Sequence, residues 1–165
     1  MPKPNIRTGM GYDVHRLAEG ESFFLGGIEI EHHKGCVGHS DGDTLIHAIA
    51  DALLGAANKG DIGEHFPDTS KEYKNIDSKI LLKETCRIIR NAGYEIGNID
   101  SVIALQKPKV KPYLPKMRSV LANTMQIDQA DISIKATTTE KLGFVGEEKG
   151  IAAYVSVLIY EIDLP

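Results

Sequence analysis

The 165-residue chain has no tryptophan, only two cysteines, and no hydrophobic run long enough to cross a membrane. Its longest apolar run, residues 151–160, is far shorter than the roughly 20 residues of a membrane-spanning helix and is typical of a buried strand. Cys36 and Cys86 lie far apart in the sequence and indicate no disulfide framework. Because no apolar leader follows Met1, we expect a cytoplasmic protein with no membrane role.

Neither sign of charge dominates the sequence. The 19 Lys and Arg residues stand against 23 Asp and Glu, which gives a net charge of -4 at pH 7. Bulk charge therefore gives no grip on nucleic acid, and any anion must be held locally. The composition, 42% hydrophobic and 25% charged, is that of a globular protein, and the length suits one domain spanning residues 1–165.

Hydrophobic periodicity predicts three helices and several strands. A helix capped by Asp43 should run to Ala57, a second should start at Asp77 or Ser78 and end before Gly93, and Pro112 should open a third. Strands are expected at residues 6–15, 96–106, 131–137 and 151–162, with a hairpin at 22–31. This irregular order predicts an α+β fold, a mixed sheet with helices packed on one face. Apolar residues on both sides of the last strand suggest that copies of the chain cover the other face.

Three residues form a candidate metal site. Asp13 and His15 are two positions apart, so in a strand they project from the same face, although alone they are more often a simple hydrogen-bonded pair. With His47 from the first helix they would offer one oxygen and two nitrogens and leave a fourth position open, as in catalytic zinc sites. The same donors also suit iron(II).

Other polar residues near this site have two interpretations. Asp51, one turn after His47, would either orient that imidazole or serve as a structural cap. His32 and His33 are expected to be solvent-exposed on a hairpin arm. The polar, turn-rich segment 58–75 is longer than a usual connection, so we expect a mobile functional loop.

Two further segments suggest anion and base binding. The sequence at 136–143, Ala-Thr-Thr-Thr-Glu-Lys-Leu-Gly, follows a strand and can surround a phosphate with hydroxyls and backbone N–H groups. Glu140 would then offer an oxygen to a magnesium ion shared with the phosphate; the alternative is a capping box formed by Thr137 and Glu140. The basic, proline-containing segment 106–113 would present a base pocket, or merely a solvated turn.

Six motifs, in order along nearly the whole chain, resemble those of the 2-C-methyl-D-erythritol 2,4-cyclodiphosphate synthase family. They are Gly11–His15, His39–Asp43, Asp51–Ala56, Gly60–Gly63, Phe66–Thr69 and Lys135–Phe144. The resemblance implies a homotrimer with active sites between subunits. It also implies an enzyme of non-mevalonate isoprenoid biosynthesis that cyclises a cytidine diphosphate substrate and releases CMP.

The resemblance further implies a role for particular residues. Asp13, His15 and His47 would hold one Zn²⁺ per subunit, Glu140 would hold Mg²⁺ or Mn²⁺, and His39 and Thr138 would stabilise the transition state. Asp61 and Gly63 would face the erythritol hydroxyls, residues 66–70 would form a flap, and residues 105–111 would hold cytosine from the adjoining subunit. The full set placed at the substrate is Asp13, His15, His39, Ser40, His47, Asp61, Ile62, Gly63, Phe66, Pro67, Asp68, Thr69, Ser70, Leu105, Gln106, Lys107, Pro108, Lys109, Val110, Lys111, Thr137, Thr138, Thr139, Glu140 and Phe144.

The sequence departs from the family pattern at two positions. Glu147 stands where an arginine is common, and Ser70 stands where the flap usually carries a second aspartate. Two other functions fit part of the pattern. One is a zinc phosphohydrolase that activates water at the open metal position, and the other is a trimeric nucleotide-binding protein without turnover.

Overall fold

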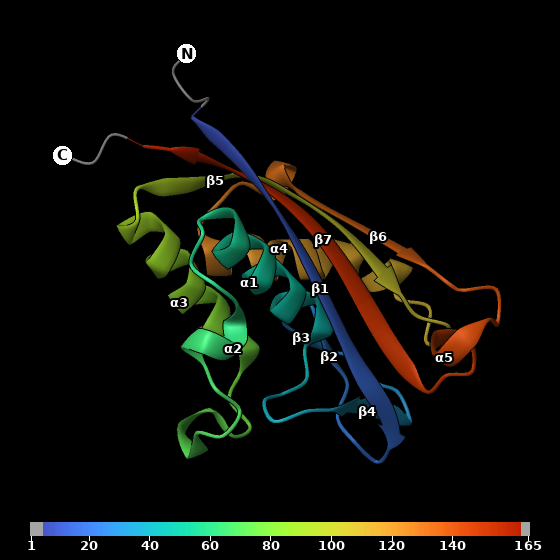
Figure 1. The fold of residues 1–165 in the computed structure, drawn as a ribbon. Coiled ribbons are helices and arrows are strands. Elements are labelled where there is room, and N and C mark those ends of the chain that lie inside the picture. Colours follow the sequence, from blue (N-terminus) through green and yellow to red (C-terminus); the bar gives the residue numbers. More distant parts are fainter. Residues whose placement is uncertain (1–4, 163–165) are drawn as a thin grey trace.

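The computed structural model describes residues 5–162, so the proline-containing segment at residues 1–4 and the last three residues lie outside it. A five-stranded mixed sheet, in the order β4-β1-β7-β5-β6, carries the three long helices α1, α3 and α4 on one face (Figure 1). Only β5 and β6 are parallel, and the other neighbours are antiparallel. The predicted α+β fold with a mixed sheet is therefore confirmed.

The strands and helices have the following bounds. The sheet comprises β1 (Ile6–Glu19), β4 (Lys34–Val37), β5 (Tyr94–Ala104), β6 (Ile132–Thr137) and β7 (Gly150–Glu161), and β2 (Phe24–Leu25) and β3 (Ile28–Glu29) form a separate hairpin. The helices are α1 (Thr44–Ala56), α2 (Ile62–His65), α3 (Ser78–Asn91), α4 (Leu114–Met125) and α5 (Gly143–Gly146). Short 3₁₀ turns lie at Lys71–Tyr73, Lys111–Tyr113 and Gln129–Asp131.

The structure differs from the sequence-based expectation at several points. β1 continues four residues past His15, and its end pairs with β4, a short edge strand that the sequence did not predict. Pro112 does not open the third helix, because it lies in a 3₁₀ turn and α4 begins at Leu114. Pro115 sits in the first turn of α4, where its missing N–H removes no helical hydrogen bond. The segment 58–75 is not wholly irregular, since it contains α2 and a 3₁₀ turn.

The core lies between the helices and the sheet. On β7 every second side chain faces this core, with Ile151, Ala153, Val155, Val157 and Ile159 all at most 2% exposed. Met117 and Met125 of α4 are fully buried. Cys36 and Cys86 are free and buried, and burial raises the pKa of each thiol to about 12. Among residues 5–162 the longest helix, α3, has 14 residues, too few to span a bilayer.

Two glycines let α1 lie directly against β1. A Cβ on Gly11 would stand 1.9 Å from the carbonyl oxygen of Ala48, and one on Gly9 would stand 2.0 Å from that of Ala52. Any side chain at either position would force the helix away from the strand. This close approach brings the middle of α1 onto the odd-numbered side chains of β1.

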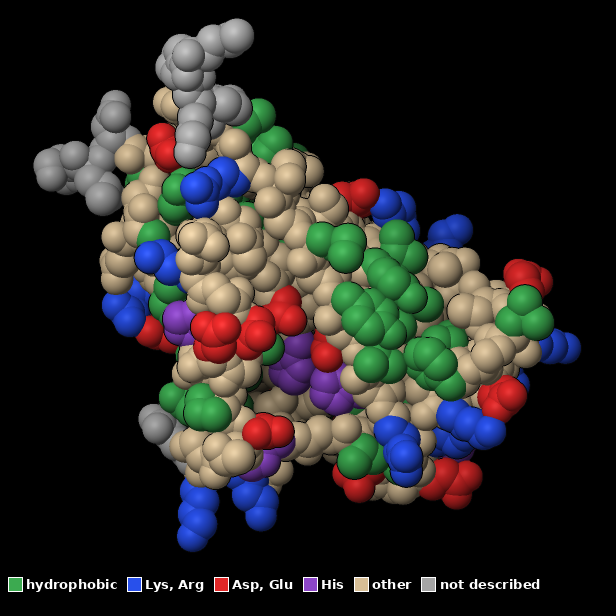
Figure 2. Space-filling model, in the orientation of Figure 1, with side chains coloured by type: hydrophobic (Ala, Val, Ile, Leu, Met, Phe, Trp, Pro, Cys, Tyr) green, Lys and Arg blue, Asp and Glu red, His purple; other side chains and the backbone are tan. Residues whose placement is uncertain are grey.

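The opposite face of the sheet is apolar, and within the described chain α5 covers only one end of it, where Val145 packs against Ala104 and Ala152. Met10 is 80% exposed, and Tyr12 and Tyr154 are 44% and 49% exposed, with their rings 5.1 Å apart. Figure 2 shows hydrophobic side chains gathered on this face beside the histidines. A surface of this kind on a folded chain marks a contact with another molecule.

Candidate functional site

The candidate metal site lies where β1 meets α1. Asp13 and His15 project from the helix-covered face of β1, and His47 projects toward them from the first turns of α1. Asp13 Oδ2 lies 2.9 Å from His15 Nδ1 and 3.3 Å from His47 Nδ1. Among the described residues these three are the single cluster of three or more His, Cys, Asp or Glu side chains close enough to share one ion, as the sequence predicted.

The donor atoms of this group suit a cation. Asp13 Oδ2 and His15 Nδ1 are buried, and although they lie 2.9 Å apart they do not have hydrogen-bond geometry with each other or with another described residue. A tetrahedral zinc ion with bonds of about 2.0 to 2.1 Å places its ligand atoms roughly 3.3 Å apart, close to the observed separations. Burial raises the pKa of Asp13, but the two imidazoles outweigh burial and leave that pKa lowered. Burial lowers the pKa of His47, and the Asp13 carboxylate reverses this and raises it.

No hydrogen bond joins Asp51 to His47. Its Oδ1 accepts a hydrogen bond of 2.7 Å from the backbone N–H of Ile62, at the start of α2. Burial raises the pKa of Asp51. Of the two roles that the sequence left open, the structure supports the structural cap. Asp61 caps the same helix through the N–H of Glu64.

A cavity of about 460 Å³ opens beside the metal site. His15, His47, His39 and Ser40 form one wall, and Figure 2 shows the histidines at this hollow. The facing wall comes from the 58–75 segment, with Ile62, Gly63, Phe66, Pro67, Asp68 and Thr69. His39 Nε2 lies 3.1 Å from the carbonyl oxygen of Ser70. Tyr73, Ile76 and Leu81 also line the cavity; the sequence did not single them out, because nothing but their place in the fold brings them there.

A second cluster forms after β6. Thr138 Oγ1 donates to Glu140 Oε1 and accepts from the backbone N–H of Glu140, both at 3.3 Å. The N–H of Lys141 points to Gln106 Oε1, and the N–H of Leu105 donates to the carbonyl of Thr137, so the 105–111 segment lies against this loop. The suggested capping box is wrong, because no helix starts at Thr137.

The side chains in and around the second cluster differ in whether they can face a ligand. Leu105 and Val110 are buried in the core, so only their backbone atoms can reach one. Lys109 and Lys111 are exposed, and Lys107 pairs with Glu148 at 3.4 Å. Phe144 on α5 is 45% exposed. Thr139 donates to the carbonyl of Leu142.

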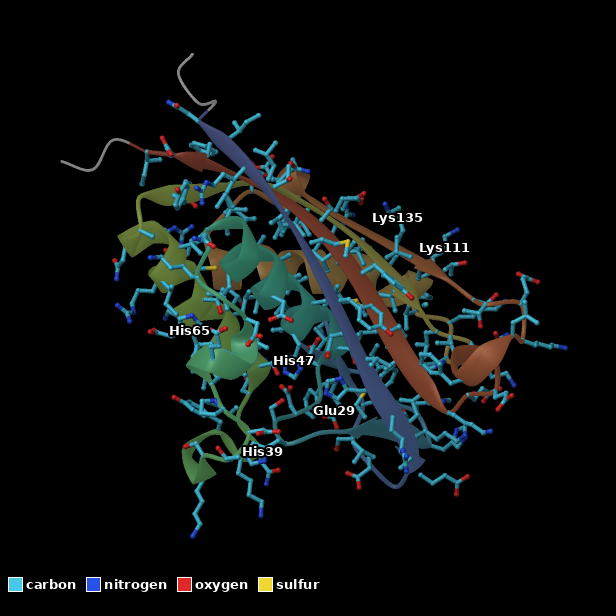
Figure 3. The ribbon with its side chains drawn as sticks, in the orientation of Figure 1. Glu29, His39, His47, His65, Lys111 and Lys135 are labelled. Carbon is cyan, nitrogen blue, oxygen red and sulfur yellow. The ribbon has the colours of Figure 1, made fainter. Side chains whose placement is uncertain are left out.

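The two clusters lie apart within one chain. Asp13 pairs with Ala153, Ala153 with Ile103, and Ile103 with Ala136, so these residues form one row across the sheet. Three strand spacings of about 4.8 Å separate the ends of this row by roughly 14 Å. Figure 3 likewise shows Lys111 on the far side of β7 from His39 and His47.

The structure also places His32, His33, Glu147 and the basic residues of α3. His33 is exposed as expected, but His32 is only half-exposed, packs between Phe23 and His33, and has its pKa lowered chiefly by burial. Glu147 pairs with Lys149. On α3, Lys83 and Arg87 are exposed. Arg90 of the same helix is instead partly buried against Glu95.

Comparison with known proteins gives consistent matches. The model of the YgbB family matches residues 6–160. A protein of Parabacteroides distasonis named 2-C-methyl-D-erythritol 2,4-cyclodiphosphate synthase is 63% identical over 154 residues, which are 93% of this chain and 96% of that protein.

Solved structures share the fold. The bifunctional IspDF of Campylobacter jejuni matches with a TM-score of 0.94 and 44% identity over 98% of this chain, which spans 44% of that protein. The IspF–CDP complex of Plasmodium falciparum matches with a TM-score of 0.85 and 33% identity, covering 98% of this chain and 100% of that one.

Proposed function

Because this chain belongs to the YgbB family, we infer that it catalyses the reaction for which its relatives are named, the formation of 2-C-methyl-D-erythritol 2,4-cyclodiphosphate in isoprenoid biosynthesis. The chain is an enzyme of the lyase class. The observation that carries the assignment to a site is the position of Asp13, His15 and His47 at the wall of the 460 Å³ cavity. The finer proposals below concern the substrate, the metals and the assembly.

The proposed substrate is 4-diphosphocytidyl-2-C-methyl-D-erythritol 2-phosphate. An oxygen of its 2-phosphate attacks the β-phosphorus, the bond from that phosphorus to the bridging oxygen breaks, and CMP leaves with the electron pair. The reaction needs no protein nucleophile, because both reacting groups belong to the substrate. The protein therefore has to fold a flexible molecule and balance its charge, tasks that can supply up to roughly 7 to 11 kcal/mol when orientation is ideal.

Asp13, His15 and His47 would hold Zn²⁺ as the resident metal, with a fourth position toward the cavity. Glu140 would hold Mg²⁺ or Mn²⁺ together with phosphate oxygens. These cations would supply positive charge that holds the two phosphates together and stabilises charge developing during transfer. His39 and Thr138 would add hydrogen bonds to the same oxygens in the transition state.

The remaining predicted residues would bind the two ends of the substrate. Asp61 and Gly63 lie at α2 and would face the erythritol hydroxyls, while residues 66–70 would act as a flap over the cavity. Backbone groups of residues 105–111, with Thr137 and Thr139 beside them, would hold the cytidine end. Support for this end comes from the CDP found in the Plasmodium falciparum relative.

A homotrimer would complete the site. Asp13 and Ala136, the residue two before Thr138, lie roughly 14 Å apart across the sheet of one chain, too far for the two proposed metal sites to act on one diphosphate. Head-to-tail contacts that close into a ring of three would place the metal cluster of one subunit beside the Thr138 cluster of the next. The apolar face around Met10, Tyr12 and Tyr154, which is exposed in one chain, would become buried in such contacts.

Incubation with the cytidyl diphosphate substrate, followed by phosphorus NMR, tests the reaction. We expect CMP and a cyclic diphosphate in equal amounts. Inorganic phosphate would instead identify a zinc phosphohydrolase, and unchanged substrate in the presence of Zn²⁺ and Mg²⁺ would identify a binding protein. Light scattering tests the assembly, since three copies of the 18.0 kDa chain make about 54 kDa.

A further inference from the structure

The far side of His47 contacts a small hydrogen-bonded group outside the substrate cavity wall. His47 Nε2 lies 2.9 Å from Ser78 Oγ. Ser78 is the first residue of α3, and it has no exposed surface. Ser78 Oγ also bonds to Asp41 Oδ1, and the backbone N–H of Ser78 donates to Asp41 Oδ2 at 2.9 Å. Both carboxylate oxygens of Asp41 therefore hold the same residue.

This arrangement fixes the direction of each hydrogen bond. A serine hydroxyl has one hydrogen, and an ionised carboxylate can only accept. Ser78 must therefore give its hydrogen to Asp41, and its oxygen can only accept a hydrogen from His47 Nε2. In neutral imidazole a proton on Nε2 leaves a free lone pair on Nδ1. His47 Nδ1 is the atom that faces Asp13 Oδ2 at 3.3 Å.

Ser40 alone would not fix the imidazole in this way. Ser40 Oγ lies 3.1 Å from His47 Nε2 and accepts from the N–H of Gly42, but its own hydrogen has no carboxylate to hold it. It could donate to Nε2 as readily as accept from it. The carboxylate of Asp41 is what makes Ser78 an acceptor and decides between the two tautomers.

The same group also ties the end of the cavity segment to the metal site. The N–H of Asp41 donates to the carbonyl of Ile76 at 3.1 Å, and the N–H of Asn75 donates to the carbonyl of His39 at 2.8 Å. Residues 39–41 and 75–78 are thus held side by side. The position of Ser78 is therefore set from both its own helix and the segment that precedes it.

We propose that Ser78, held by Asp41, is a positioning residue that keeps the proton of His47 on Nε2 and presents Nδ1 to the metal. This inference rests on the metal site of the proposed function. A partner that fixes the tautomer of a metal-binding histidine typically contributes 10- to 100-fold to metal affinity. The cap of α3 does not depend on the hydroxyl, because the side chain of Asp77 and not that of Ser78 accepts from the N–H of Lys79.

The test compares Ser78→Ala with Thr85→Val. Thr85 is on the same helix and equally buried, and its hydroxyl has no hydrogen-bond partner among the described residues, so Thr85→Val removes a buried hydroxyl without touching His47. We expect the zinc Kd, measured by chelator competition, to rise 10- to 100-fold in Ser78→Ala and to stay within twofold of wild type in Thr85→Val. Asp41→Asn, which keeps only one acceptor oxygen, should raise the zinc Kd by a smaller factor.

Long-range ¹H–¹⁵N NMR of the zinc-loaded wild type gives a readout that needs no variant. We expect the His47 proton on Nε2; a proton on Nδ1, or an unchanged zinc Kd in Ser78→Ala, would overturn the inference. An equal rise in Thr85→Val would also overturn it, by showing general loosening. If the wild type binds no zinc, the proposed metal role is wrong. The same NMR measurement on the metal-free protein at pH 9 then shows independently whether the His47 proton is on Nε2.

Discussion

Removing the Asp43 carboxylate should destabilise the protein far more than removing an ordinary helix cap. Asp43 is fully buried, and its side chain accepts hydrogen bonds from the N–H of Ile46 at 3.0 Å, of Gly26 at 2.9 Å and of Gly27 at 2.7 Å. It therefore caps α1 and anchors the β2–β3 hairpin at once. Burial raises the pKa of this carboxyl.

The expected size follows from the groups left without partners. Loss of a helix cap costs about 1 kcal/mol. Each backbone N–H left unsatisfied in a buried place costs about 1 to 3 kcal/mol, and the N–H of Gly27 is only partly buried. We therefore expect Asp43→Ala to lower the free energy of unfolding by about 3 to 5 kcal/mol. That is a large share of the 5 to 15 kcal/mol that usually holds a domain together.

Asp77→Ala is the matched control. Asp77 caps α3 through the N–H of Lys79 at 2.9 Å, but its side chain is 45% exposed and, within residues 5–162, makes no direct hydrogen bond to the hairpin. Urea unfolding of the metal-free proteins should give a loss of about 1 kcal/mol for Asp77→Ala. Asp43→Asn, which keeps one acceptor oxygen, should lie between the two. Equal losses for Asp43→Ala and Asp77→Ala would refute the anchoring of the hairpin.

Three further predictions concern the metal, the chemistry and pH. His47→Ala should retain no zinc by elemental analysis and show no turnover while staying trimeric in light scattering; one zinc per chain would contradict the three-ligand site. Thr138→Ala should lower kcat roughly 10²-fold with little change in CDP affinity, and a rise in KM alone would make its hydroxyl a ground-state contact. The Arg90 guanidinium outweighs burial and holds the pKa of Glu95 below its usual value of about 4.3. The pair should therefore stabilise the fold by about 1 kcal/mol at pH values above that usual pKa, and this stabilisation should be lost as the pH falls through the lower pKa of the folded protein. Glu95→Gln should remove this pH dependence from the free energy of unfolding measured in urea.

Much of the fold was readable from local patterns. The helix after Asp43 and the alternation along β7 are signals within one segment, so periodicity and capping residues suffice to place them. The short strand β4 exists only because the end of β1 pairs with it, and four residues carry no periodic signal of their own. The helix start predicted at Pro112 was wrong for a related reason, because a 3₁₀ turn and the first turn of a helix accept proline equally well.

The ligands of the candidate site could be predicted from the sequence, but the residues that hold those ligands in place could not. Asp13, His15 and His47 stand out because polar residues interrupt apolar patterns at spacings that share a face. Nothing in the sequence pairs Asp51 with Ile62, or Ser78 with His47, because those contacts depend on how α2 and α3 dock against α1.

With Zn²⁺ in the proposed site, the absence of a side chain at Gly9 and Gly11 would make the amount of bound metal a measure of core packing. Zinc–ligand distances in protein sites stay within about 0.2 Å of their usual values. His47 precedes Ala48, the residue whose carbonyl oxygen rests on Gly11, so any bulk added at that glycine moves the helix and the ligand together. In a library of core variants, the zinc retained after purification would therefore rank how well each restores the native separation of helix and strand, even for substitutions far from the ion.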